Sequence, residues 1–258
     1  MEQEREKAAF RGRAARAPRE RTPKSGGSTS TFMLEQKARR ETWAPVPDWH
    51  SRGYLPHCNE NGLIQNITFR LFDSVPAETI AGWQTKLGIN PGLAAHDPQN
   101  AELRRRIDRY EDAGHGKCWL RHQQIAELIQ NTMLFFDGER YRLLEWCVMP
   151  NHVHALILPI KGYLTAKIVH SWKSYTGHAV KKLIDLAEPF WMAEYHDQFI
   201  RDNRHLEVVQ DYIRQNPVTA RLVSNAEDWQ WSSANPRNAV PGSPGSAGGS
   251  PISANLRS

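Results

Sequence analysis

The stretch Trp146-Cys-Val-Met-Pro-Asn-His-Val-His-Ala-Leu-Ile-Leu-Pro159 contains two histidines, His152 and His154, separated by one residue. The apolar residues that follow them, 155–158, favour a β-strand. Alternate side chains of a strand point to the same face, so both imidazoles leave one face of the predicted strand. Two neutral imidazoles on one face form half of a divalent-metal site. Such a pair is also common in strands where it has only a structural role.

A second segment, residues 204–216, predicts an amphipathic helix that Pro217 closes. Its apolar positions recur at helical spacing: Leu206, Val209 and Ile213. Tyr212 and Asn216 are four residues apart and therefore share a helical face. An amide oxygen suits a hard cation, and a tyrosyl oxygen one turn away could attack a phosphate polarised by that cation. Taken alone, the segment equally describes a surface helix with a half-buried tyrosine.

Together, the two segments resemble the REP-associated tyrosine transposases, a branch of the single-tyrosine HUH (His-hydrophobic-His) transposases that act on single-stranded DNA. The matching segments follow the order of the family over about residues 50–234: Tyr54-Leu-Pro-His57, Ile67-Thr-Phe-Arg70, Arg140-Tyr-Arg-Leu143, Met149-Pro-Asn-His-Val-His154, Trp172-Lys-Ser-Tyr-Thr176, Phe199-Ile-Arg-Asp202, Tyr212-Ile-Arg-Gln-Asn-Pro-Val218 and Trp229-Gln-Trp-Ser-Ser233. The chain departs from the family at Ala220-Arg221-Leu222, where members commonly carry Ala-Gly-Leu, and at Gly177-His-Ala-Val-Lys-Lys182, where members usually carry an Asn.

The resemblance implies a transposase, a metal-dependent endonuclease and strand transferase that acts on palindromic, hairpin-forming REP-like DNA. In that reading Tyr212 is the catalytic nucleophile and forms a covalent bond with a 5′ phosphate. His152, His154 and Asn216 bind the metal cofactor, Mg²⁺ or Mn²⁺. The partner is single-stranded DNA, and relatives work as monomers or as homodimers.

Two other functions fit the same residues. The chain could be a domesticated protein that binds hairpin DNA with little or no cleavage. It could also be a metal-dependent phosphohydrolase that uses the histidine pair with water as nucleophile, in which case Tyr212 is structural.

Three further residues are candidate DNA-binding positions, namely Lys173 in the Trp172-Lys-Ser-Tyr-Thr176 segment and Arg201 and Arg204 before the tyrosine helix. Each could contact a phosphate or be an ordinary solvated side chain. Trp229 and Trp231 could stack on bases, but packing of the last segment onto the core is the favoured interpretation.

The length of 258 residues and the 40% hydrophobic content predict one domain with a substantial core, flanked by tails. We expect a basic disordered arm over residues 1–48, one catalytic domain over 49–234 and a Pro, Gly and Ser rich disordered tail over 235–258. Residues 1–45 hold eleven Lys or Arg and six Asp or Glu, which accounts for the whole net charge of +5. The arm either contacts DNA or is an unstructured extension, and Met33 is an alternative start of translation.

No apolar run approaches the length of about 18 residues that spans a bilayer, so we expect a cytoplasmic, nucleoid-associated protein without membrane contact. The three cysteines, Cys58, Cys118 and Cys147, are widely spaced, which favours reduced thiols over a disulfide framework.

The periodicity predicts an α+β fold. Strands are expected at about residues 62–71, 140–149, 152–158 and 194–199, and helical stretches at 76–111, 120–136, 162–186 and 203–215. That order fits a ferredoxin-like antiparallel sheet with helices on one face. The resemblance further implies that the histidine strand is central and that the tyrosine helix packs beside it.

Overall fold

The computed structural model describes residues 49–51, 56–58, 63–89 and 98–238. Its main sheet has four antiparallel strands in the spatial order β4-β5-β3-β6. They are β3 (Gln65–Leu71), β4 (Tyr141–Val148), β5 (His152–Pro159) and β6 (Trp191–Phe199). A two-stranded antiparallel sheet pairs β1 (Trp49–Ser51) with β2 (Pro56–Cys58).

The helices occur where the hydrophobic periodicity predicts them. The α-helices of the described ranges are α3 (Ala77–Leu87), α4 (Pro98–Asp112), α5 (Gln123–Phe135), α6 (Thr165–Leu183) and α7 (Asn203–Thr219). Three short 3-10 helices accompany them: η1 (Trp119–Arg121), η2 (Ala226–Asp228) and η3 (Pro236–Asn238).

The connection of these elements is that of a ferredoxin-like fold. The chain leaves β3 through α3, α4 and α5, forms the β4-β5 pair and returns through α6 to β6. The central strands of the sheet are β3 and β5, as a split βαβ arrangement requires. The predicted α+β fold class is therefore confirmed, and His152 and His154 lie on a central strand.

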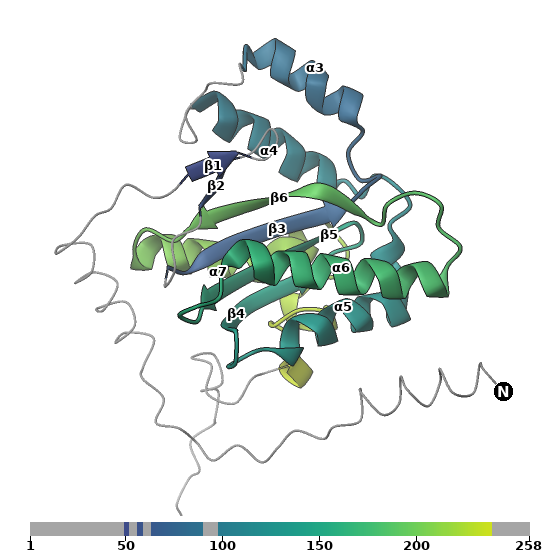
Figure 1. Ribbon diagram of the computed structural model, residues 1–258, viewed down its shortest axis with the longest axis vertical. Coiled ribbons are helices and arrows are strands. Elements are labelled where there is room, and N and C mark those ends of the chain that lie inside the picture. Colours follow the sequence, from purple (N-terminus) through teal and green to yellow (C-terminus); the bar gives the residue numbers. More distant parts are fainter. Residues whose placement is uncertain (1–48, 52–55, 59–62, 90–97, 239–258) are drawn as a thin grey trace, which may run out of the picture.

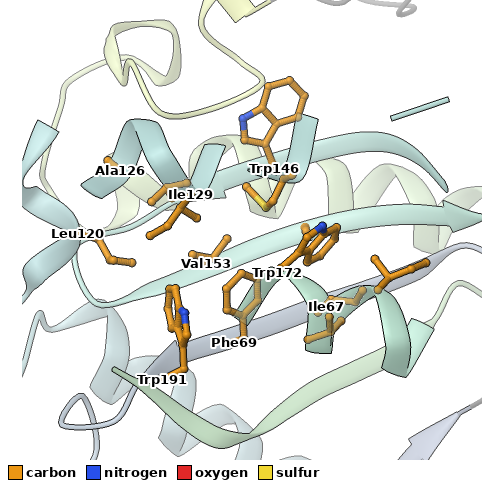
Figure 2. Packing of buried hydrophobic residues seen from close by; sticks show 14 of the residues in the cluster. Ile67, Phe69, Leu120, Ala126, Ile129, Trp146, Val153, Trp172 and Trp191 are labelled. Carbon is orange, nitrogen blue, oxygen red and sulfur yellow. The ribbon is translucent and has the colours of Figure 1, made fainter. Parts of the chain in front are cut away.

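One face of the sheet is covered by α5 and α6 (Figure 1). Figure 2 shows its aromatic centre, where Phe69 of β3 lies beside Trp172 of α6 and Trp191 of β6. The ring centroids are 6.1 Å and 4.8 Å from that of Phe69. Val153 of β5 points into the same cluster. This large buried cluster fixes the central strands from one side.

The opposite face is covered by α7, which lies behind the sheet in Figure 1. Leu156 of β5 packs there with Leu206, Val209 and Ile213 of α7. The expectation that the helices lie on one face is therefore wrong. The physical reason is that β5 carries buried residues on both of its faces, so each face needs a cover.

The tyrosine helix does not end before Pro217, as the sequence predicted, but continues through it to Thr219. A proline in the last turn removes one backbone hydrogen bond, and the neighbouring bonds remain, from Ala220 N to Asn216 O at 2.9 Å and from Leu222 N to Pro217 O at 2.9 Å. The helix ends at Thr219, and Arg221, two residues later, has a φ of 57°, which lies in the left-handed region.

The segment after α7 closes the outer edge of β4. Val148 N donates to Trp231 O at 2.8 Å, and Ser233 N donates to Trp146 O at 2.9 Å. The indole of Trp229 donates to Val148 O at 3.0 Å. These bonds favour a packing role for this aromatic segment over base stacking.

The predicted arm, residues 1–48, and residues 239–258 of the predicted tail lie outside the described residues. Of the predicted thiols, Cys118 and Cys147 are free and buried. Within the described ranges, no helix combines the length and apolar character that crossing a bilayer requires.

Candidate functional site

The site is built on the face of β5 that α7 covers. His152 and His154 alternate with Val153, so their side chains share a face with Leu156 and point away from the aromatic cluster. Each histidine is only 1% exposed. Their Nε2 atoms lie 3.0 Å apart. The predicted pair is therefore buried and convergent.

Hydrogen-bond partners of the two Nδ1 atoms orient the His152 and His154 rings. Asn151 uses its Nδ2 to donate to the carbonyl oxygens of Glu111, at 3.1 Å, and His115, at 2.9 Å. Its Oδ1 is therefore the acceptor for His152 Nδ1, 2.8 Å away, which leaves a lone pair on His152 Nε2. His154 Nδ1 lies 3.0 Å from the hydroxyl of Thr68. Partners of this kind fix the orientation of metal-binding histidines.

Both imidazoles are neutral at physiological pH. Burial lowers the pKa of His154 to about 3, and the positive charge of Arg104 adds to the effect. Burial also lowers the pKa of His152 well below its ordinary value, with contributions from His154, Arg104 and Arg70. The neutral imidazole is the form that binds metal ions.

The helix α7 brings Tyr212 and Asn216 to the histidines. Asn216 is 1% exposed, and its Nδ2 lies 3.2 Å from His154 Nε2. The Tyr212 ring stands edge-on to the His154 ring, with centroids 5.2 Å apart, and 39% of the residue is exposed. The structure thus brings together all four residues predicted for the catalytic and metal site.

The surroundings of Tyr212 keep its hydroxyl protonated. Burial raises the pKa of Tyr212, and the carboxylates of Asp108, Asp112 and Glu111 raise it further, while Arg104 opposes them. Arg104 lies on α4, and its Nη2 is buried without a hydrogen-bond partner in the described part of the chain. Ionisation of this hydroxyl near neutral pH would therefore need additional positive charge beside it.

Polar contacts join α7 to the sheet near the tyrosine. Glu145 of β4 is 3% exposed and accepts hydrogen bonds from Gln210 at 3.1 Å and from Ser233 at 2.6 Å. It also forms an ion pair with Arg214 of α7. The bonded positions 210 and 214 flank Tyr212, so Glu145 fixes the turn of the helix that carries it.

The donor set fits a hard divalent cation when the amide is counted. Taking His, Cys, Asp and Glu alone, the described residues contain no group of three that could hold a metal ion. Asn216 Oδ1, however, is buried without a hydrogen-bond partner among those residues. Rotation of the amide exchanges Nδ2 and Oδ1, which would present an oxygen beside the two nitrogen lone pairs. Imidazole nitrogens suit transition metals and an amide oxygen suits hard cations such as Mg²⁺ and Mn²⁺, so this donor set can hold a divalent cation.

The three candidate DNA-binding residues lie at two other places in the structure. Lys173 lies on α6, across the sheet from the histidines, and donates to Ala193 O at 2.6 Å. Arg201, just before α7, and Arg204, in its first turn, are both exposed. Their proposed contacts with DNA remain predictions.

Sequence reasoning missed three polar residues at the site. Asn151 and Thr68 lie inside the matched segments, next to His152 and on the paired strand, so their position was available as a signal. Asp112, at the end of α4, has its Oδ1 3.7 Å from His152 Nε2. Nothing in the local sequence around Asp112 indicates this proximity.

The similarity of this chain to known proteins is distant. Among curated proteins, none matches the chain. The distantly similar solved structures include two transposases. One is a REP-associated tyrosine transposase bound to a REP hairpin, with 17% identity, a TM-score of 0.45 and coverage of 69% of this chain and 79% of that chain. The other is a candidate transposase from Deinococcus radiodurans R1, with 12% identity, a TM-score of 0.29 and coverage of 65% of this chain and 96% of that chain.

The family model described as "Transposase IS200 like" matches residues 120–216. That range runs from the middle of η1 to Asn216, so it contains the histidine strand and most of the tyrosine helix. The family resemblance read from the sequence is confirmed by this match, which covers residues 120–216 of the chain.

Proposed function

We propose that this chain is a metal-dependent endonuclease and strand transferase of single-stranded DNA that forms a covalent 5′-phosphotyrosine on Tyr212. One observation carries the proposal: the Tyr212 ring and the Asn216 amide meet the buried histidine pair on one face of the sheet. A nucleophile beside a set of convergent metal donors is the arrangement that phosphoryl transfer requires.

The partial exposure of Tyr212 supports its role as the nucleophile, because a DNA phosphate could approach its hydroxyl. Its hydroxyl oxygen would attack the phosphorus of a phosphodiester and form a new Tyr–O–P bond. The tyrosyl hydroxyl gives up its proton to water, the bond from phosphorus to the 3′ oxygen breaks, and the leaving oxygen takes up a proton from water as a free 3′ hydroxyl. Since the phosphoester energy is kept in the protein–DNA bond, another 3′ hydroxyl can reverse the step without ATP.

His152, His154 and Asn216 would hold the cation, with Asn151 and Thr68 orienting the rings. When bound, the divalent ion supplies a Lewis acid that withdraws charge from the phosphate oxygens. The chain itself contributes Arg104, whose charge opposes the acidic residues around Tyr212. The position of α7, fixed through Glu145, aligns the tyrosine with the site.

The substrate we propose, hairpin-forming REP-like DNA cleaved in transposition or repeat mobilisation, follows from the sequence resemblance. A domesticated hairpin-binding protein and a water-using phosphohydrolase are the competing functions. Both leave Tyr212 without a chemical role, although it contacts the histidine pair.

The test is cleavage of labelled single-stranded hairpin DNA from repeats flanking the gene, with Mn²⁺ or with chelator, by the wild type and Tyr212→Phe. We expect metal-dependent cleavage that the Phe variant loses. Metal-dependent hydrolysis retained in Tyr212→Phe would establish the phosphohydrolase instead. Hairpin binding by the wild type with no cleavage under either condition would establish the binding protein.

A further inference from the structure

The C-terminal end of α4 lies against the histidine pair, although it is far from it in the sequence. Asp112 is the last residue of this helix, and its Oδ1 is 3.7 Å from His152 Nε2. The two histidine nitrogens are themselves 3.0 Å apart. Adjacent donors around a small divalent cation lie about 3 Å apart. As it stands, the carboxylate lies outside that spacing, and His152, His154 and Asp112 do not by themselves form a ligand group among the described residues. Ligation by Asp112 therefore needs a small rotation of its side chain toward the histidines.

The backbone that carries Asp112 is held in place by its neighbours. Glu111 is 2% exposed and pairs with Arg70 of β3, with 3.3 Å between Oε1 and Nε. Asn151, which also orients His152, donates to the carbonyl oxygens of Glu111 and His115. Asp112 is therefore fixed at its backbone on both sides. Its side chain is 23% exposed, which leaves room for the small adjustment that ligation needs.

Two oxygen atoms at this place lack a close hydrogen-bond donor, although the Asn216 side chain does interact with the Asp112 carboxylate. Asp112 Oδ1 and Asn216 Oδ1 are both buried and have no hydrogen-bond partner in the described ranges. An unsatisfied buried oxygen costs about 1–3 kcal/mol, and more when the group is charged. Both oxygens belong to residues that contact the histidine pair, Asp112 through His152 and Asn216 through His154. A cation bound among these side chains would satisfy both oxygens together.

We propose that Asp112 is a fourth protein ligand of the divalent cation, beside His152, His154 and Asn216. The inference rests on the proposed function, since it concerns the same metal site. It adds the single anionic donor to a set of neutral ones. A carboxylate oxygen favours hard cations such as Mg²⁺ and Mn²⁺, whereas two imidazoles and an amide alone discriminate less among divalent ions.

The first test measures binding of Mn²⁺ to the full chain without DNA, by the electron paramagnetic resonance signal of the free ion. Asp112→Asn should bind Mn²⁺ at least about tenfold more weakly than the wild type. Loss of a residue that only hydrogen-bonds a metal ligand already lowers metal affinity about 10–100-fold. Asp108→Asn is the matched control. It removes the same charge one turn earlier on α4, where Asp108 pairs with Arg104, and should change the affinity far less.

A second test asks whether position 112 touches the metal. Asp112→Cys loaded with Co²⁺ should show a near-ultraviolet sulfur-to-cobalt charge-transfer band that the Co²⁺-loaded wild type lacks. Equal Mn²⁺ affinity in the wild type and Asp112→Asn, an equal loss in Asp108→Asn, or no such band would overturn the inference. In each of these cases the proposed function stands if the wild type binds Mn²⁺. A wild type that binds no Mn²⁺ would contradict the metal-dependent function itself.

Discussion

Thr68 on β3 lies directly opposite His154 on β5, and its hydroxyl oxygen is 3.0 Å from His154 Nδ1. Because the pair joins the two central strands, the register of the sheet sets the orientation of the imidazole. The ring then presents Nε2 toward His152 and Asn216. The pairing of the two central strands thus helps to set the geometry of the site.

Replacement of Thr68 by Val should weaken metal binding while the fold is kept. The change is nearly isosteric and removes the hydroxyl, so the His154 ring loses its outer partner. We expect the Mn²⁺ dissociation constant to rise about 10-fold or more, measured by calorimetric titration. Thr68→Ser retains the hydroxyl and serves as the control. An equal affinity in the Val and Ser variants would show that the hydroxyl does not orient the ring.

Removal of Glu145 should loosen the tyrosine helix. Glu145→Ala loses buried hydrogen bonds to Gln210 and Ser233 and the ion pair with Arg214, so we expect the free energy of unfolding to fall by about 2–3 kcal/mol. Amide exchange in α7 should accelerate more than in α5. The control, Glu139→Ala, removes an exposed carboxylate in the turn that precedes β4. Similar stabilities for the two variants would rule out this role.

Replacement of Arg221 by Gly should stabilise the protein. Arg221 has a φ of 57°, a conformation that costs other residues more than glycine. The gain is reduced by the greater freedom of glycine in the unfolded chain, so we expect a rise of about 0.5–1 kcal/mol in the free energy of unfolding. Gln215→Gly, at an exposed position inside α7, should instead lower it by about 1 kcal/mol. A destabilised Arg221→Gly protein would contradict the strain assigned to this turn.

Lys173 should make stability depend on pH in the alkaline range. Burial lowers the pKa of Lys173 to about 8, while Glu194 opposes this shift. Between about pH 8 and the ordinary lysine pKa, the unfolded chain binds more protons at this group, so stability rises with pH. The wild type should therefore gain stability relative to Lys173→Met from pH 7 to 10. A parallel pH dependence in the two proteins would exclude the shift, and Lys182→Met, at an exposed position, should behave as the wild type.

Much of the fold follows from local sequence patterns. The alternation around His152 and the helical spacing of Leu206, Val209 and Ile213 predict the strand and the helix that the structure contains. What periodicity does not specify is which face of the sheet a helix covers, because that depends on packing across the whole domain. This is why α7 lies opposite α5 and α6 rather than beside them. The sequence predicted that α7 ends before Pro217. The helix continues through this residue because a proline in the last turn removes only one backbone hydrogen bond.

The four predicted site residues came from two segments, and only the family resemblance implied that the segments meet. The sequence did not predict that Asp112 belongs to the site. Its proximity to His152 depends on the path of α4 across the domain, which no local pattern encodes. Lys173 is the opposite case, a residue that the sequence suggested for DNA binding but that lies away from the histidine pair. It belongs to a matched segment, yet the tertiary structure places it on the other side of the sheet from the histidines.

The central claim is that Tyr212 becomes joined to a 5′ phosphate. The most direct measurement is mass spectrometry of a tryptic digest after reaction with hairpin DNA and Mn²⁺, since cleavage after Arg204 and Arg214 isolates a peptide, residues 205–214, whose single tyrosine is Tyr212. We predict a nucleotide adduct on that peptide, with the protein retaining a 3′ label of the DNA and releasing a 5′ label. Cleaved DNA with an unmodified 205–214 peptide, or an adduct on another residue, would contradict the account.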